Sequence, residues 1–422
     1  MKQLPSFFRV RQTFPRPRLD DLPGEVVKQL KRLQESTTQR LEGKRIAVTA
    51  GSRGIANIAT ILRASVDWLK TQGCEPFVVP AMGSHGNASV DGQLAVLKSL
   101  GVTEESLGCP IHGSMDVVEV CHSELGFPIF IDRHAAEADG VLVVNRIKPH
   151  TRFHGDIESG LMKMMLIGLG NARGAELYHQ AIVQSSFGAI VRSVATQVIE
   201  KCGVIGGLAI LENGYEETTR IVGVPPKSII ETEPKLLDEV KALMPSLPFD
   251  QADFLVIDRM GKNISGTGID TNIVGRKRND NAAIGDERPD IHHIYVRSLT
   301  EQTNGNASGI GVADLCHQRV LEQINLASTR KNCITAGHIS GAKLPVDFSC
   351  DREAITTACQ LAGYLKPEQV RAMWIRDTLS LDEVACSSGY LSQAQASSHL
   401  EILSDPQPLE FDESGNLEFL LD

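Results

Sequence analysis

The first half of the chain alternates short apolar runs with longer amphipathic segments. Runs of strand length predict strands at residues 45–50, 75–81, 127–133, 140–145 and 204–212. Segments with apolar residues at every third or fourth position predict helices at residues 25–43, 57–73, 90–101 and 181–203. Strands that alternate with helices in this way predict a mostly parallel sheet with helices on both faces.

A second α/β unit follows the stretch ALMPSLPFDQAD, in which two prolines interrupt the periodicity. After it the pattern predicts strands at residues 254–258 and 293–299 and helices at residues 311–324 and 352–365. Since 422 residues exceed what one hydrophobic core usually supports, we expect two domains, at residues 1–249 and 250–422. The predicted fold class is α/β, with each domain a mostly parallel sheet flanked by helices.

Composition and charge argue against several functional classes. A net charge of -10 disfavours a nucleic-acid surface, which needs clustered Lys and Arg. No apolar stretch is long enough to span a membrane, and no apolar core follows the basic N-terminal segment as in a secretory signal. The nine Cys residues are scattered without a C-x-x-C pair, which is typical of a reduced, cytoplasmic protein.

The segment RIAVTAGSRGIAN, residues 45–57, has the strand, turn and helix order of a nicotinamide-dependent dehydrogenase. Short-chain enzymes of that class carry TGxxxGxG, and here Ala50 and Ala56 replace two of the three glycines. They also use a Tyr followed four residues later by Lys, a pair that none of the five Tyr residues forms. The turn therefore argues against a dinucleotide, although the helix N-terminus and Arg53 can still attract an anion.

Three loops expected after strands carry residues suited to chemistry. Arg53 and His85 follow the first two predicted strands. A longer segment contains His150, His154, Lys163 and His179. Because ligands bind at the carboxyl ends of strands in such sheets, these loops predict one shared site. Lys163 lies in the apolar run GLMKMMLIGLG, where it either extends from a buried helix to solvent or serves as a desolvated amine for covalent chemistry.

The histidines of this segment also allow a zinc site. His150, His154 and His179 could supply three nitrogen ligands and leave one position open. Pro149 and Gly155 interrupt the segment, however, so the geometry of a helical His-x-x-x-His pair is not expected.

The spacing of Lys163 and His179 resembles that of the nickel-pincer lactate racemases and their 2-hydroxy acid racemase and epimerase relatives. In that family a PH…GG.K segment precedes a histidine 16 residues beyond the lysine, as here. The resemblance implies that Lys163 forms the covalent link to the pincer nucleotide and that His179 is the protein ligand to nickel. It also implies catalytic roles for His85, in GSHG, and His150, in KPH. The likeness extends over about residues 44–278.

Two further elements resemble this family. Ser52, Arg53 and Gly54 are similar to its TRP turn, which implies contacts with the cofactor phosphate or the substrate. The stretch GTGIDTN is similar to its GYPxDxN element. The resemblance therefore implies that Asp270 and Asn272 reach the cofactor from the second domain.

The chain departs from the family pattern at several positions. The segment between His150 and Lys163 is longer than usual, so His154 is an alternative for the second base. One of the two glycines before the lysine is replaced, Gly86 stands where the family has Arg, and the YQxxK element after Asn272 is absent. The substrate therefore need not be lactate, and the sequence leaves open which 2-hydroxy acid it is.

The resemblance implies a racemase or epimerase of a small 2-hydroxy acid, working by proton-coupled hydride transfer through a 2-keto acid. The implied cofactor is the nickel-pincer nucleotide, nickel pyridinium-3,5-bisthiocarboxylic acid mononucleotide, supplied by cofactor-biosynthesis proteins. The first domain would bind it, and the second would close over the active site. The alternatives are a non-catalytic homologue that binds a carboxylate or nucleotide and, with less support, an NAD(P)-dependent oxidoreductase. An oligomer is compatible with the sequence.

Overall fold

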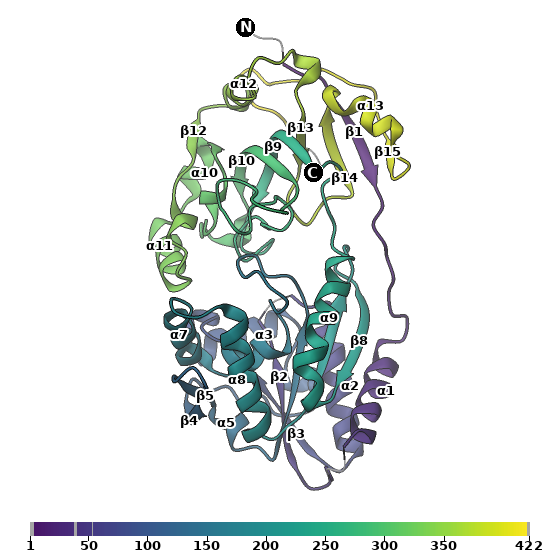
Figure 1. Ribbon diagram of the computed structural model, residues 1–422, viewed down its shortest axis with the longest axis vertical. Helices are drawn as coiled ribbons and strands as arrows, with labels where there is room; N and C mark the ends of the chain where they lie inside the picture. Colours follow the sequence, from purple (N-terminus) through teal and green to yellow (C-terminus); the bar gives the residue numbers. More distant parts are fainter. Residues whose placement is uncertain (1–3, 38–39, 53, 420–422) are drawn as a thin grey trace. The chain divides into compact units, whose positions relative to one another are not determined.

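The computed structural model describes residues 4–37, 40–52 and 54–419. The chain forms two compact units (Figure 1): the first unit is Pro15–Met244, and the second unit consists of the described residues on either side of it. The prediction placed the boundary after residue 249 and the N-terminal residues in the first domain. The structure instead pairs strand β1 (Phe7–Gln12) with β14 (Glu383–Ser387) of the second unit, because the apolar side of β1 completes that sheet.

The first unit is built around a five-stranded sheet in the order β3-β2-β6-β7-β8. The first four strands are parallel, and β8 is antiparallel to β7. These strands are β2 (Arg45–Ala50), β3 (Glu75–Pro80), β6 (Gly140–Arg146), β7 (Val204–Glu212) and β8 (Thr218–Val224). Neighbouring residues of β6 belong to different core clusters, Val143 to one and Leu142 and Val144 to the other. Both faces of the sheet are therefore buried, which confirms the predicted α/β layers.

Helices cover each face of this sheet. They are α1 (Leu22–Glu35), α2 (Ile58–Thr71), α3 (Val90–Ser99), α4 (Glu104–Leu107), α5 (Arg133–Ala136), α6 (Leu161–Lys163), α7 (Asn171–Ala181), α8 (Phe187–Lys201) and α9 (Ile229–Lys241). The short 3-10 helices are η1 (Gly86–Ala88) and η3 (Pro226–Ser228), and η2 (Met164–Gly168) is a π-helix. Apolar residues of α1 and α2 pack in one core cluster, and those of α8 and α9 pack in the other.

Three predicted elements of the first unit differ in the structure. The predicted helix 25–43 ends at Glu35, well before Gly43. The predicted strand 127–133 is β5 (Pro128–Asp132), which pairs only with β4 (Val117–His122) in a separate two-stranded sheet. The predicted helix 181–203 is the end of α7 and a separate helix α8, because Ser186 caps α8 by accepting a hydrogen bond from Ala189 N.

The second unit contains an eight-stranded sheet in the order β12-β11-β10-β9-β13-β14-β1-β15. The pairs from β12 to β13 are parallel, and the remaining three pairs are antiparallel. Its other strands are β9 (Gln251–Met260), β10 (Asp290–Leu299), β11 (Leu315–His317), β12 (Val346–Phe348), β13 (Ala372–Ile375) and β15 (Leu400–Ile402). Its helices are α10 (Gln318–Gln323), α11 (Leu326–Thr335), α12 (Asp351–Leu361) and α13 (Leu391–Ala396). The short 3-10 helices are η4 (Glu301–Thr303), η5 (Ile310–Val312), η6 (Ile339–Ala342), η7 (Pro367–Gln369) and η8 (Ser388–Tyr390).

The predicted helix at residues 311–324 is wrong in its first half. Leu315 and Cys316 pair in parallel with β10 as part of strand β11, and within the predicted range only Gln318–Gln323 is α-helical. His317 marks the change, because its side chain accepts a hydrogen bond from Arg319 N at the start of α10. The apolar residues of this stretch are compatible with a short buried strand or with a helix. Pairing with β10, which is distant in sequence, selects the strand.

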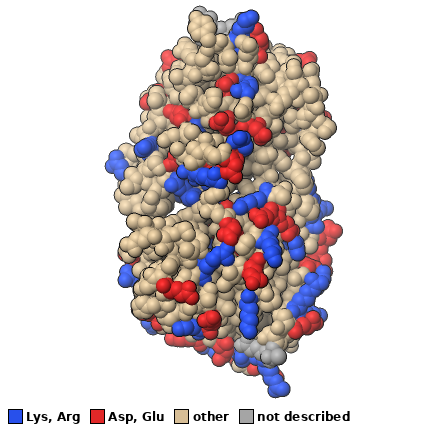
Figure 2. Space-filling view, viewed as in Figure 1, with Lys and Arg blue, Asp and Glu red and all other residues tan. Residues whose placement is uncertain are grey.

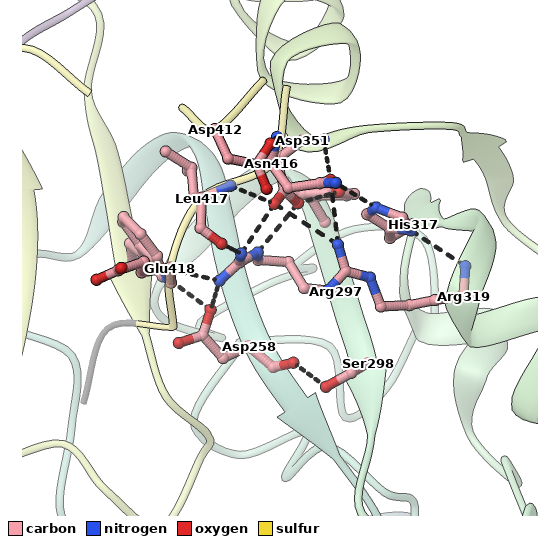
Figure 3. A network of polar contacts seen from close by, with 12 residues as sticks. Asp258, Arg297, Ser298, His317, Arg319, Asp351, Asp412, Asn416, Leu417 and Glu418 are labelled. Atoms are coloured by element: carbon pink, nitrogen blue, oxygen red, sulfur yellow. Dashed lines mark hydrogen bonds and ion pairs between the residues drawn. The ribbon is translucent and has the colours of Figure 1, made fainter. Parts of the chain in front are cut away.

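Arg297, on β10, is the centre of a buried polar network in the second unit (Figure 3). Its guanidinium forms ion pairs with Asp258 and Asp351, and all three side chains are fully buried. It also donates to the backbone carbonyl oxygens of Leu417 and Glu418. Arg297 therefore holds the segment that contains Leu417 and Glu418 against the sheet.

Charged side chains of both signs are interspersed on the face shown in Figure 2. On the helices of the first unit, ion pairs join residues one turn apart, as Arg63 with Asp67 on α2 and Arg173 with Glu176 on α7. Among the residues that the structure describes, no helix is long and apolar enough to cross a membrane.

Candidate active site

The parallel strands β2, β3 and β6 end at the same edge of the first sheet, and the loops that follow them carry the predicted site residues. Backbone hydrogen bonds join these loops. Ala81 N donates to Ala50 O at 2.8 Å, and Gly83 N donates to Gly168 O at 3.4 Å. The loop that carries His85 therefore contacts both the end of β2 and the π-helix that follows Lys163.

His85 lies in a loop with an unusual backbone. Asn87 and Ala88 have φ angles of 58° and 55°, in a region that residues other than glycine rarely adopt. Backbone strain of this kind occurs mainly where the surrounding structure imposes it, often at functional sites. The ring Nδ1 of His85 lies in hydrogen-bond contact with Ser52 Oγ, so the structure brings these two predicted site residues together.

The turn after β2 is the one predicted to bind an anion. Gly54 is exposed in it, and Arg53 lies outside the residues that the structure describes. Just before α2, which begins at Ile58, the backbone N–H of Ala56 donates to Glu212 Oε1 at 2.7 Å. A carboxylate of the protein itself thus accepts a backbone hydrogen bond within this turn, ahead of the N-cap residue Asn57.

His150 is held in a tight turn after β6. Its Nδ1 accepts hydrogen bonds from the backbone N–H groups of Arg152 and Phe153, at 3.0 and 3.2 Å. The Phe153 ring stacks on the imidazole with a centroid distance of 4.0 Å. His154, the alternative for the second base, is exposed. The structure thus fixes the ring of His150, and the choice between His150 and His154 as the second base stays a prediction.

Lys163 and His179 lie on different helices, and the charge of one acts on the other. Lys163 ends α6, and its Nζ lies 5.4 Å from the centroid of the Phe153 ring. Burial, and then the positive charge of Lys163, lower the pKa of His179 on α7. Because that charge acts on the imidazole, the structure brings the two residues of the 16-residue spacing within electrostatic reach of each other.

The helical segment that carries Lys163 is fixed at its start by a buried carboxylate. Glu233, on α9, accepts a hydrogen bond from Met162 N at 2.9 Å. Gly160 precedes the segment and offers no side chain as a cap, and a Cβ at Gly160 would overlap Glu233 Oε1. Burial raises the pKa of Glu233 to about 7, although its hydrogen bonds from backbone N–H groups act in the opposite direction.

The end of the same segment is fixed by close packing of the backbone. A Cβ at Gly168 would overlap Met164 Sδ and lie 2.8 Å from Ala81 O. Asn171, just after the π-helix, has a φ of 49° and donates to Asp132 Oδ2 at 3.1 Å. π-helical turns occur often at functional sites. Here the π-helix places the lysine segment against the loop of His85.

Asp270 and Asn272 lie in the loop after β9 of the second unit. Asp270 is buried, and its Oδ1 accepts hydrogen bonds from both Asn272 N (2.9 Å) and Asn272 Nδ2 (2.8 Å). The two residues thus form one rigid turn, which Thr378 supports by accepting a hydrogen bond from Asp270 N. Their predicted role toward a cofactor remains a prediction.

The zinc site considered from the sequence is not formed. In the described part of the chain, no group of three His, Cys, Asp or Glu side chains is arranged to hold a metal ion. His150, His154 and His179 are all among the described residues, so together they do not supply three nitrogen ligands.

Sequence reasoning missed the two buried carboxylates that hold the site loops. Glu158, whose side chain is fully buried, accepts a hydrogen bond from His150 N and pairs with Lys241. No motif marks it. The sequence pattern does single out Glu233, because it lies on the face of α9 whose other buried residues are apolar. A charged residue on the buried side of a helix needs a polar partner, and here the partner is the backbone next to Lys163.

No family model and no curated protein sequence matches this chain. Its fold, however, is similar to solved structures. The lactate racemase apoprotein from Thermoanaerobacterium thermosaccharolyticum matches with a TM-score of 0.56 and 13% identity, over 88% of this chain and 94% of that one. A Thermotoga maritima protein solved by a structural genomics consortium matches with a TM-score of 0.52 and 12% identity, over 87% and 99%. At these identities the likeness concerns the fold: this chain has a lactate-racemase-like α/β fold.

Proposed function

We propose that this protein is a racemase or epimerase of a small 2-hydroxy acid that uses the nickel-pincer nucleotide. One observation carries the proposal: Lys163 and His179, which match the family spacing, interact electrostatically in a chain with a lactate-racemase-like fold. The contacts of His85 and His150 at the same edge of the sheet give it further support.

The side chains at this edge fit the cofactor. A metal ligand must offer an unprotonated nitrogen, and the lowered pKa of His179 keeps its imidazole neutral. Lys163 offers the amine for the covalent link, half-buried beside the ring of Phe153. When bound, the cofactor supplies the hydride transfer that the protein's own side chains cannot perform. Contacts with its nucleotide are proposed for Ser52, Arg53, Gly54, Asp270 and Asn272.

The remaining task of the protein is to handle the substrate's hydroxyl group. Conversion of a 2-hydroxy acid to a 2-keto acid requires loss of the hydroxyl proton, and an imidazole that titrates near neutral pH is suited to accept and return it. His85 and His150 are the imidazoles proposed to contact this oxygen. Their separate loops would place them on different sides of a substrate, as inversion at one carbon requires.

The experiment that tests the proposal is intact-mass analysis of the protein co-expressed with enzymes that build the cofactor. We expect a mass increase on the peptide that contains Lys163, nickel in the purified protein, and interconversion of the enantiomers of a 2-hydroxy acid by chiral chromatography. Lys163→Arg should abolish the adduct, whereas Lys148→Arg, on the same segment, should keep it. An adduct on another lysine would refute the assignment, and binding of a nucleotide without an adduct would indicate the non-catalytic homologue.

A further inference from the structure

The hydrogen bonds of His150 determine which of its ring nitrogens carries the proton. Its Nδ1 accepts hydrogen bonds from the backbone N–H groups of Arg152 and Phe153. A ring nitrogen that accepts hydrogen bonds presents its lone pair to the donors and carries no hydrogen itself. In the neutral imidazole of His150 the proton is therefore on Nε2.

Several contacts hold the ring in this orientation. The Phe153 ring is nearly parallel to it, with an interplanar angle of 14°. The backbone N–H of His150 donates to Glu158 Oε2 at 2.7 Å, and Glu158 Oε1 lies 3.3 Å from Lys241 Nζ. A flip of the ring would place a C–H group against the two backbone donors and leave them without an acceptor. The orientation with Nδ1 as acceptor is therefore the stable one.

His85 has a different kind of partner. Its Nδ1 contacts the hydroxyl group of Ser52, which can act as a donor or as an acceptor. Rotation of that hydroxyl lets either ring nitrogen of His85 carry the proton. His85 can thus both accept and return a proton, whereas the two backbone N–H groups at His150 can only donate.

Starting from the proposed function, we infer that the two histidines have different tasks. His85 takes the proton from the substrate hydroxyl and later returns it to the same oxygen. His150 donates a hydrogen bond from Nε2–H to that oxygen and does not exchange protons, because its Nε2 has no lone pair to offer. A fixed neutral donor of this type stabilises the negative charge that develops on an oxygen as it loses its proton.

The protonated nitrogen can be measured without cofactor or substrate. Long-range ¹H–¹⁵N correlation spectra of the full-length chain, with ¹⁵N-labelled histidine at about pH 8, distinguish the Nε2–H form from the Nδ1–H form. Among the 12 histidines, the signals of His150 are those lost in both His150→Gln and His150→Leu. We expect only the Nε2–H form for His150. The Nδ1–H form, or a mixture of similar amounts, would overturn the inference.

A second experiment separates hydrogen-bond donation from proton exchange in the loaded protein. Gln at position 150 keeps an N–H donor near the place of Nε2 and cannot act as a base, whereas Leu keeps neither property. We expect His150→Gln to retain racemisation within about tenfold of wild type and His150→Leu to lose a hundredfold or more, while His85→Gln is as impaired as the loss of a general base implies. If His150→Gln is as inactive as His150→Leu with the adduct and nickel intact, the donor role is wrong.

The outcomes distinguish this inference from the proposed function. If wild-type protein forms no adduct on Lys163, the proposed function fails, whatever the tautomer of His150. If the adduct forms and racemisation occurs but His150 carries its proton on Nδ1, only the division of tasks between His85 and His150 fails.

Discussion

Replacing Arg297 with Met should destabilise the second unit by about 3–5 kcal/mol, the usual cost of breaking a buried ion pair by removing one partner. The wild-type guanidinium has no exposed surface and compensates two carboxylates that have none either. It also satisfies the carbonyl oxygens of Leu417 and Glu418. Met fills a similar volume but leaves all of these acceptors without their donor.

The partners that remain in the variant show why the cost is high. Asp258 would keep the hydrogen bond from Trp374 Nε1, and Asp351 would keep those from Tyr295 OH and Leu417 N. These donors are neutral, and the cation Arg319 is 3.9 Å from Asp351 Oδ2, so the close charge compensation that Arg297 gives both carboxylates would be lost. For a domain of this size, a loss of this magnitude lowers Tm by roughly 6–20 °C.

Tryptophan fluorescence is a suitable assay because the protein has two Trp residues, one in each unit. Trp374 contacts Arg297, at 5.3 Å from its guanidinium, whereas Trp68 is in α2. In a Trp68→Phe background, urea unfolding followed by fluorescence therefore reports the second unit. Arg9→Met is the matched control, because Arg9 is 44% exposed in its pair with Glu383 and should contribute about 0–1 kcal/mol.

The difference in the free energy of unfolding between wild type and Arg297→Met should depend on pH, which provides a second check. Burial alone would raise the pKa of Asp351, but the hydrogen bonds and charge of Arg297 lower it below its ordinary value. In wild type, ionised Asp351 stabilises the folded state through Arg297. This stabilisation is present above the pKa that Asp351 has in the unfolded state, and it is lost as the pH falls. Without Arg297 burial dominates, so stability should instead fall as the pH rises, and the gap between the two proteins should widen from about pH 4 to pH 7. A gap below 1 kcal/mol at pH 7, like that of the surface pair, would refute the reasoning.

Three further predictions concern the first unit. Glu233 has a pKa raised to about 7 from 4.5, so its contribution to stability is complete below the unfolded-state pKa and is lost as the pH rises through 7. Glu233→Gln should therefore stabilise the protein relative to wild type by up to roughly 3 kcal/mol at pH 8 but not at pH 4 in urea unfolding, and an equal difference at both pH values would contradict this. Gly168→Ala should cost about 1–3 kcal/mol because its Cβ overlaps Met164 and Ala81, whereas Gly188→Ala in α8, with no atom closer than 4.0 Å, should be neutral or stabilising in thermal unfolding. His179→Ala should lose nickel by metal analysis but retain the adduct on Lys163 by intact mass, and retention of nickel would show that another residue is the ligand.

Strands β2, β3, β6 and β7 could be predicted because each is a nearly continuous apolar run buried on both faces. Strands β4 and β8 were not predicted, because partly exposed positions interrupt their apolar residues. The π-helix could not, since the run GLMKMMLIGLG gives no periodicity that distinguishes an α-helix from a π-helix, whereas the structure shows the hydrogen bond from Leu169 N to Met164 O, five residues back. Strand β1 was missed because its partners are far away in sequence. Arg9 of β1 pairs with Glu383, 374 residues later, and no local pattern encodes such a pairing.

In the candidate site too, features that depend on neighbouring residues in the sequence could be predicted, and features that depend on folding could not. The spacing of Lys163 and His179 can be read directly from the chain, and in the fold the charge of Lys163 acts on His179. The tautomer of His150 could not be foreseen, because it depends on the turn at Arg152 and Phe153. Glu158 was missed because a single carboxylate becomes significant only when folding buries it against a particular backbone N–H group.

The position of β1 between β14 and β15 has a consequence for the synthesis of this protein. At 5–20 residues per second, the 374 residues that separate Arg9 from Glu383 take roughly 20–75 s to be translated. During this interval Phe8 and Val10, which are buried in the finished sheet, have no strand to pair with, while residues 15–244 can already fold. A nascent chain therefore carries an exposed apolar strand for many seconds, and a chaperone that binds extended apolar segments would protect it from pairing with another chain.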